Sequence, residues 1–410
     1  MVAAGVSPDA RGMATTTIES TSESTSESTS ESTSESTART RDLTPDVARA
    51  VGLLGVAVVN AALLAPHAAV STADKVTSAV VVGLLENRSW PMFALMFGFG
   101  IAAIAGKLQR LGVDAKARRR VLVRRNALLF AVGLAQVVLV FWGDILGVYG
   151  LTGMVVVALL GRSRRTLAVV GAISVVLWTV GTILTATPGG SDVVPSSPDF
   201  LASIGERLVV FAFWTGANGL LITHLAPMLV GVVLYRSGAL HRPAEHLALH
   251  RRLVALGLPI GLLGAVPLIL MVTGAWTPSS QVHAVALGVH AATGVLQGVA
   301  YVSAIALWSV RRTAAHRTGG PAARLAAVGS RSLTVYLVHS VLLGVSLSAW
   351  ALDLAPRLSL AGTYGLGLGV WCVCAAVALV LSALGRPGPA DAALRRLTYG
   401  GALGDAGSGR

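Results

Sequence analysis

Residues 47–65 read VARAVGLLGVAVVNAALLA, a stretch in which Arg49 is the only charged side chain. A bilayer core about 30 Å thick is crossed by about 20 helical residues at ~1.5 Å each, so this stretch is suited to cross a membrane. Nine further stretches share its apolar character, although the second is short, and together they predict an all-α polytopic membrane protein. The ten stretches are Val47–Ala65, Trp90–Ala105, Val121–Phe141, Ile145–Leu160, Leu167–Thr185, Gly219–Tyr235, Leu253–Val272, Val285–Trp308, Leu333–Leu352 and Thr363–Leu384.

The basic residues divide unevenly between the two sides of these stretches. If the amino terminus starts in the cytoplasm and the chain crosses ten times, all but Lys75, Arg88, Arg207 and Arg357 of the 32 Lys and Arg residues lie on the cytoplasmic side. With nine or eleven crossings, the Lys and Arg residues would no longer gather on one side of the membrane. Because Lys and Arg are enriched in cytoplasmic loops, we expect ten spans in the cell membrane with both termini cytoplasmic.

The composition excludes a soluble domain and argues against nucleic-acid binding. Hydrophobic residues make up 54% of the chain and charged residues 12%, about half the share in a soluble domain. The net charge of +13 comes from clusters at the ends of the stretches, without the interleaved aromatic residues of a base-stacking surface. The expected partner is therefore the lipid bilayer, with its anionic headgroups.

The ends of the chain are expected to lie outside the membrane domain. Residues 1–45 repeat Glu-Ser-Thr-Ser and should be disordered, either as a phosphorylated switch or as a neutral low-complexity expansion. They lack the apolar core of a cleavable signal peptide, so the first span should act as the insertion signal. Thr44 is predicted to cap the first helix, the transmembrane domain to cover 46–401, and 402–410 to form a flexible tail.

Few other features suggest a particular structure or a bound cofactor. Phe200–Ala217 is amphipathic and is expected to form a helix at the outer membrane interface. Cys372 and Cys374 are two residues apart on a helix, so they point to different sides and predict neither a disulfide nor a metal site. There is no zinc-ligand spacing, nucleophile elbow or dinucleotide fingerprint, and we expect no permanently bound cofactor.

Polar side chains inside apolar stretches are costly and mark candidate sites. In the first stretch Asp46 and Arg49 share a helix face, and Asn60 returns to nearly the same face eleven residues after Arg49. They are either an ion pair at the headgroups with a helix-packing Asn, or part of a site. Asp144 stands in a very short connection, where it either caps the next helix or orients a base or substrate.

Charged and histidine residues continue this pattern in later stretches. Glu86 and Arg88 are expected at the outer mouth of the second stretch, where Gly98 and Gly100 permit close helix contact. Two predicted helix stripes and His224 either form hydrogen bonds between packed helices or belong to a functional site. The stripes are His283, His290, Gln297 and Tyr301, and Ser332, Tyr336, His339 and Leu343. His339 lies near mid-membrane and is the best-placed general base.

Several of these segments together resemble the YeiB-like family of bacterial membrane proteins, over about residues 43–401. The matching segments are Asp46–Arg49 with Asn60, Met92–Gly100, Arg118–Gly133, Gly143–Leu146 with Tyr149-Gly150, and Gly388-Pro389 with Arg395–Gly400. The resemblance implies a fold related to the transmembrane acyltransferases, which pass an acyl group from cytosolic coenzyme A thioesters to an acceptor across the membrane. Tyr336–His339 resembles a short pattern in some O-acyltransferases. Gln136 stands where many relatives have His, and an amide cannot act as a base.

We therefore expect an acyltransferase-like membrane protein with acyl-CoA as co-substrate. A small-molecule transporter and a non-catalytic protein of the same fold are the alternatives. The acceptor would be a small molecule, glycan or lipid, and the protein a monomer or homo-oligomer. The expected site residues are His339 and Asp144 as catalytic groups, Arg49, Asn60, Glu86, Arg88, Tyr149, His290 and Tyr336 as substrate contacts, and Arg118, Arg119, Arg120 and Arg124 as coenzyme A phosphate contacts.

Overall fold

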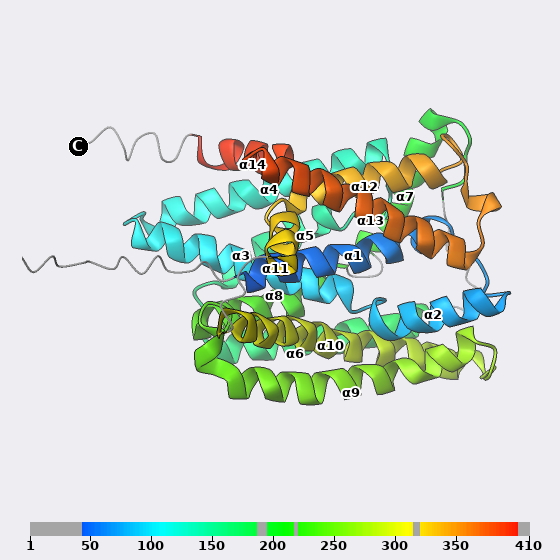
Figure 1. The fold of residues 1–410 in the computed structure, drawn as a ribbon, viewed down its shortest axis with the longest axis horizontal. Helices are drawn as coiled ribbons and strands as arrows, with labels where there is room; N and C mark the ends of the chain where they lie inside the picture. Colours follow the sequence, from blue (N-terminus) through cyan, green and yellow to red (C-terminus); the bar gives the residue numbers. More distant parts are fainter. Residues whose placement is uncertain (1–42, 187–194, 217–219, 315–319, 401–410) are drawn as a thin grey trace, which may run out of the picture. The chain divides into compact units, whose positions relative to one another are not determined.

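The computed structural model describes residues 43–186, 195–216, 220–314 and 320–400, and over these ranges the regular structure is helical (Figure 1). Short 3-10 helices cover Pro243–His246 and Ala355–Arg357. The α-helices are α1 (Thr44–Leu64), α2 (Thr72–Leu84), α3 (Ser89–Arg110), α4 (Ala115–Leu139), α5 (Ile145–Leu159), α6 (Arg164–Thr185), α7 (Phe200–Gly216), α8 (Leu220–Ser237), α9 (Leu247–Val272), α10 (Ser280–Ala314), α11 (Pro321–Gly329), α12 (Ser332–Leu347), α13 (Leu360–Ala383) and α14 (Pro389–Tyr399).

The structure confirms an all-α membrane protein but corrects the number of spans. Each of the ten predicted stretches falls on a helix, yet seven segments of the described chain are long and apolar enough to cross a membrane, or up to eight if the bent pair α11–α12 forms one span. Helix α5 has 15 residues and is about 22 Å long, shorter than the bilayer core. The seven segments are Thr44–Leu64, Thr72–Arg110, Ala115–Leu139, Arg164–Thr185, Pro243–Val272, Ser280–Thr313 and Leu360–Ala383.

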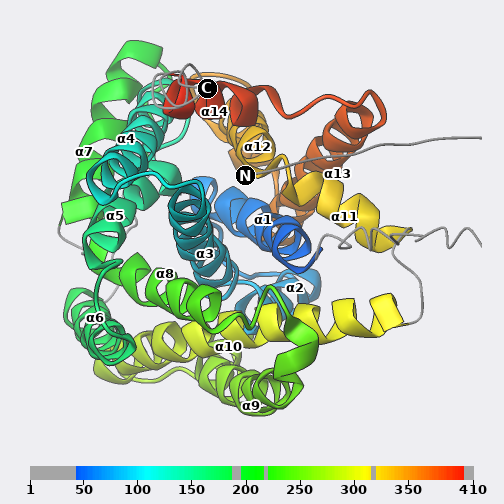
Figure 2. The ribbon, with the colours of Figure 1, turned by 90° about the vertical axis from the view of Figure 1, so that its left-hand side faces the viewer.

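Helices α1 and α3 lie at the centre of the bundle, with α2, α4, α5, α8, α10, α12 and α13 around them (Figure 2). Their small residues allow this packing. Ala48, Ala50 and Ala57 of α1 have no exposed surface, and a Cβ at Gly98 of α3 would collide with the carbonyl oxygen of Met228 in α8. The close contact expected at Gly98 is therefore confirmed.

Several predicted boundaries shift by a few residues. Helix α1 begins at Thr44, and Leu43 occupies the N-cap position without a side-chain cap, so Thr44 is not the cap and residues 44–45 belong to the helix. Pro45 fits because the first turn needs no N–H donor from it. The predicted helix after Phe200 is confirmed and ends at Gly216. The predictions for 1–42 and 401–410 lie outside the described residues.

The two ends of the bundle differ in charge. We call the end where α3 finishes and α4 begins the basic end, because Lys107, Arg110 and Lys116 lie there (left in Figure 1). The other end, where α3 begins and α4 finishes, is the opposite end. Which end faces the cytoplasm stays a prediction from the distribution of basic residues.

Candidate functional site

A cavity of about 350 Å³ lies between α1, α3, α5, α6, α8 and α10 at the opposite end. Three tryptophan side chains, Trp90, Trp142 and Trp178, line it, and we call it the tryptophan cavity. Four residues singled out in the sequence as separate polar groups meet here. They are Asn60, Glu86, Asp144 and His224. Mostly apolar walls with a few convergent polar groups are typical of small-molecule sites.

Asn60 is the clearest unsatisfied group in this cavity. Its residue surface is 6% exposed, and its side-chain Nδ2 donates to no acceptor among the described residues. A buried amide donor without a partner costs free energy comparable to a lost hydrogen bond. A ligand or water that accepts a hydrogen bond from Asn60 would remove that cost.

Asp144 is held at the cavity wall by two hydrogen bonds. Its Oδ2 accepts from the backbone N–H of Gly147 at 2.6 Å, which confirms the predicted helix cap, and its Oδ1 accepts from the hydroxyl of Tyr336 at 2.9 Å. Asp144 is buried in the connection between α4 and α5. Burial raises the pKa of its carboxyl to about 6, against the lowering effect of both hydrogen bonds.

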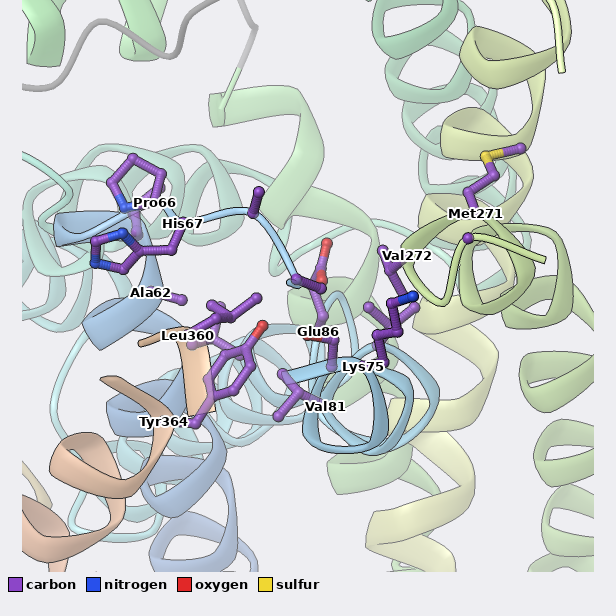
Figure 3. A pocket seen from close by; sticks show the side chains of 17 residues that line it. Ala62, Pro66, His67, Lys75, Val81, Glu86, Met271, Val272, Leu360 and Tyr364 are labelled. Carbon is purple, nitrogen blue, oxygen red and sulfur yellow. The ribbon is translucent and has the colours of Figure 1, made fainter. Parts of the chain in front are cut away.

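A second cavity of about 640 Å³ adjoins the first, and we call it the vestibule (Figure 3). Glu86, Val59 and Leu63 line both cavities. In Figure 3 the carboxylate of Glu86 and the hydroxyl of Tyr364 lie at the space that the vestibule residues surround. The Glu86 side chain is 36% exposed, so it is the acidic group that reaches both cavities and remains accessible. The vestibule also contains His67 and Lys75, to which the sequence assigned no role in a site.

Arg88 lies apart from both cavities. The backbone at Asn87 has φ of 54°, a conformation that Asn tolerates better than most residues, and this break between α2 and α3 turns Arg88 inward. Arg88 has no exposed surface. Its Nε donates to Gln297 Oε1 at 2.9 Å and its Nη2 to the carbonyl oxygen of Gly261 at 2.9 Å. The expected place at an exposed mouth is therefore wrong.

The predicted His stripe of α10 completes this buried network. Arg88 Nη1 donates to the Glu86 carbonyl oxygen at 2.7 Å and contacts the ring nitrogens of His290. Gln297 in turn donates to the carbonyl oxygen of Gly83 at 3.0 Å. His290 and Gln297 are buried and line neither cavity, whereas His283 at the start of the stripe is exposed. The network ties the α2–α3 break to α9 and α10.

A third cavity, about 320 Å³, opens at the basic end and is the basic pocket. Arg118 and Arg119 line it, together with Tyr235 and Arg236. Arg120 and Arg124 are exposed and do not line it, because they project from other sides of α4. At the start of α4 Asp114 caps the helix, and the N–H of Ala117 holds the pKa of its carboxyl below the ordinary value.

An aromatic layer separates the basic pocket from the tryptophan cavity. Trp90 lines the cavity and Ala102 the basic pocket, twelve residues apart on α3, or about 18 Å. The ring of Tyr149 packs against Phe93 and Phe97 between them, at centroid distances of 5.9 and 5.3 Å. Tyr149, an expected substrate contact, donates to the carbonyl oxygen of Trp90 at 2.9 Å and lines neither of the cavities that this layer separates.

His339 is buried away from the three cavities. Its ring lies 4.9 Å from the ring of Tyr336, and neither ring nitrogen has a hydrogen-bond partner among the described residues. The side-chain nitrogen and oxygen of Gln136 likewise have no hydrogen-bond partner among the described residues. The structure therefore joins Asp144 to Tyr336 and places Tyr336 beside His339, but His339 does not line the tryptophan cavity, the vestibule or the basic pocket.

Arg49 lies toward the basic end and forms an ion pair with Asp46 at 3.0 Å, which confirms the pairing expected within α1. Arg125 ends the basic loop Arg118–Arg125, which the sequence suggests as a contact for coenzyme A phosphates, although Arg125 is not among the individually predicted site residues. Its guanidinium lies over the ring of Phe97, 5.1 Å from the centroid. Across the described residues, no three His, Cys, Asp or Glu side chains are grouped so as to hold a metal ion.

Comparison with known proteins finds a similarity over the carboxy-terminal part of the chain. Residues 234–401 match the family model described as "Protein of unknown function (DUF418)". No curated protein matches the chain. The matched residues run from the end of α8 through α14, whereas Asn60, Glu86 and Asp144 of the tryptophan cavity precede them. Over residues 234–401 the chain is therefore similar to the DUF418 family.

Proposed function

We propose that this protein is an acyltransferase-like membrane protein that moves an acyl group from cytosolic acyl-CoA to an acceptor at or across the membrane. The observation that carries the proposal is the pair of chemically opposite cavities at the two ends of one bundle. The basic pocket is lined by Arg118 and Arg119, and the tryptophan cavity by Glu86 and Asp144. A phosphorylated donor and a neutral or hydroxylated acceptor suit these two environments.

The donor would bind at the basic end, which we assign to the cytoplasm because cytoplasmic segments are enriched in Lys and Arg. The guanidinium groups of Arg118 and Arg119 would make charge-assisted hydrogen bonds to the coenzyme A phosphates. The acyl group, at the far end of a long flexible arm, would extend toward the tryptophan cavity. It would need to pass the aromatic layer around Tyr149, so transfer includes a rearrangement of those side chains.

Glu86 is the group best placed to act as the base, because it lines both cavities at the opposite end and is accessible. Its carboxylate would take the proton of an acceptor hydroxyl or amine while that atom attacks the thioester carbonyl carbon. The carbon–sulfur bond then breaks, and the departing thiolate takes up a proton. His339 would act through Tyr336 and Asp144 as a positioning group, which departs from its expected role as the base.

Transfer of radiolabelled acetyl groups from acetyl-CoA tests this function in the full-length protein reconstituted with extracted membrane lipids and glycans. Labelled product is expected from the wild type. Glu86→Gln should reduce its rate by about 10²–10⁴-fold if Glu86 is the base. Glu245→Gln, an exposed acidic residue paired with Arg242, is the matched control and should retain the wild-type rate. Equal rates in His339→Ala and wild type would exclude a role for His339.

Binding of the acyl donor can be tested with two double variants of arginines on α4, one inside the basic pocket and one outside it. Coenzyme A should raise the thermal midpoint of the wild type, because a ligand that binds the native state stabilises it. The Arg118→Gln/Arg119→Gln variant should lose that rise. The Arg120→Gln/Arg124→Gln variant removes two exposed charges from the same helix outside the pocket and should keep it. A rise that survives in the first variant would place the donor elsewhere.

A small-molecule transporter is the second candidate, favoured by the aromatic layer. Cavities at opposite ends of a bundle, closed off from each other by Phe93, Phe97 and Tyr149, are also what an alternating passage requires. The two functions differ in whether the solute is chemically changed. Uptake of an unmodified solute into vesicles, without release of free coenzyme A, would favour the transporter. A protein that neither transfers nor transports would be the non-catalytic form of this fold.

A further inference from the structure

We infer that Arg49 and Arg125 form a phosphate-binding site at the basic end, separate from the basic pocket. Both side chains lie on one surface of α3. The Arg125 guanidinium stacks over the ring of Phe97, and Arg49 Nη2 is 3.5 Å from the position a Cβ would take at Gly100. Phe97 and Gly100 are three residues apart on α3, so they are neighbours on its surface and place the two guanidinium groups close together.

The site has more positive than negative charge. Arg49 pairs with Asp46 through Nη1 at 3.0 Å, and over the described residues no second carboxylate forms an ion pair with either arginine. Arg125 Nη1 is buried and finds no acceptor among the residues that the structure describes. Two neighbouring, partly buried guanidinium groups repel each other, and Arg125 Nη1 retains an unmet donor. A bound anion would remove both penalties at once.

The geometry of the donors points to a phosphate. Guanidinium groups present planar pairs of N–H donors that match the oxygens of phosphate or carboxylate. Tyr399 of α14 lies in the neighbourhood of Arg125, and its neutral hydroxyl can donate a hydrogen bond. The Arg49 side chain is 26% exposed, which leaves a route for the anion from the basic end. The phosphate can belong to a lipid headgroup or to a soluble phosphate ester, and both carry this chemistry.

This inference does not rest on the proposed acyl transfer, since a transporter would need the same charges neutralised. Arg118 and Arg119 line a pocket formed with α5 and α8, whereas Arg125 faces α1 and α14. Anion binding at Arg125 should therefore persist when the Arg118→Gln/Arg119→Gln variant has lost the effect of coenzyme A.

The test is the thermal midpoint of the full-length protein in detergent, with two probes at constant ionic strength. The probes are inorganic phosphate and mixed micelles that contain phosphatidic acid. Wild type should gain a few degrees with at least one probe over a chloride control. Arg125→Gln should lose that gain. Arg124→Gln removes an exposed neighbouring charge and should keep it.

The pattern of outcomes identifies the source of the phosphate or overturns the site. A gain confined to phosphatidic acid indicates a lipid headgroup, and a gain with inorganic phosphate indicates a soluble phosphate. Equal gains in Arg125→Gln and wild type, or no gain with any probe, would overturn the site. So would a large loss of stability in anion-free Arg125→Gln, because it would mean that the chain itself satisfies Arg125. Arg125→Lys keeps the charge without the paired donors and should show a reduced gain.

Discussion

Arg88 is fully buried and Arg125 is partly buried in the helical bundle, and they differ in what surrounds them. Around Arg88, acceptors from α9, α10 and the α2–α3 break satisfy each nitrogen of the guanidinium. Around Arg125, the ring of Phe97 covers one face and Nη1 has no acceptor among the described residues. The number of hydrogen-bond acceptors that the fold supplies therefore distinguishes a structural arginine from a binding arginine.

The two regions also differ in access. Arg88 has no exposed surface, and its partners His290 and Gln297 are likewise buried. Arg49, the neighbour of Arg125, is partly exposed at the basic end. The closed network around Arg88 leaves no space for a ligand. The accessible pair Arg49 and Arg125 is not fully neutralised by Asp46, so an anion can bind there and stabilise it.

Arg88→Met should have the largest effect on stability. The substitution removes the Arg88 donors from the Gln297 amide oxygen and from two backbone carbonyl oxygens, and each buried acceptor left without a donor costs about 1–3 kcal/mol. Arg88→Lys should recover only part of this, because one ammonium group cannot reach all the acceptors. Chemical denaturation in detergent measures both values. Arg110→Met at the exposed basic end is the control. If Arg88→Met lowers the free energy of unfolding by less than about 1 kcal/mol, the proposed difference between Arg88 and Arg125 is wrong.

Asp144 is an intermediate case, with two hydrogen bonds but no cation beside it. Its pKa is raised to about 6 in the folded state, mainly by burial, so the native protein binds a proton there that the unfolded chain, with an ordinary pKa of about 3.9, releases. Its contribution is therefore greatest below about pH 4 and is lost as the pH rises through 6. Over that range wild type should lose up to about 3 kcal/mol relative to Asp144→Asn. Parallel stability curves of the two proteins from pH 4 to 7 would contradict the assignment.

Tyr336→Phe should have a smaller effect, about 2 kcal/mol, because it removes two hydrogen bonds of a buried hydroxyl. The hydroxyl accepts one from the backbone N–H of Ile145 and donates the other to Asp144 Oδ1. The same bond lowers the pKa of Asp144, so its loss should raise that pKa above its wild-type value. A double-mutant cycle with Asp144→Asn separates the two contributions. Strict additivity of the two substitutions would mean that the hydroxyl and the carboxyl do not interact.

Much of the fold could be predicted from the sequence because its signal is local. Each predicted apolar stretch lies on a helix, since apolar length alone indicates a buried helix. Helix α2 was missed because Asp74, Lys75 and Ser78 interrupt its apolar run, yet Asp74 is used by the fold as part of a capping box. The excess in the predicted number of spans arises partly from α5, which is apolar but too short.

The candidate site was predictable as separate residues but not as a cavity. Asn60, Glu86 and Asp144 stood out because each is polar in apolar surroundings, which is visible in the sequence. Their convergence depends on how α1, α3 and α5 pack, and no local pattern encodes that. The same limit explains Arg88 and Arg125. The sequence shows two arginines at the ends of apolar stretches, and only tertiary contacts show that one is satisfied and the other is not.

Arg125→Met should have the smallest effect, within about 1 kcal/mol of wild type when no anion is present. The substitution removes a cation–π contact worth about 0.5–1 kcal/mol. It also removes a buried charge without a full set of partners, and replacement of such a charge by an apolar side chain is often neutral or stabilising. Denaturation of Arg125→Met beside Arg124→Met, in buffer free of phosphate and of anionic lipid, measures the difference. A loss as large as that of Arg88→Met would show that the two arginines have the same structural role, and the distinction drawn from their partners would then be wrong.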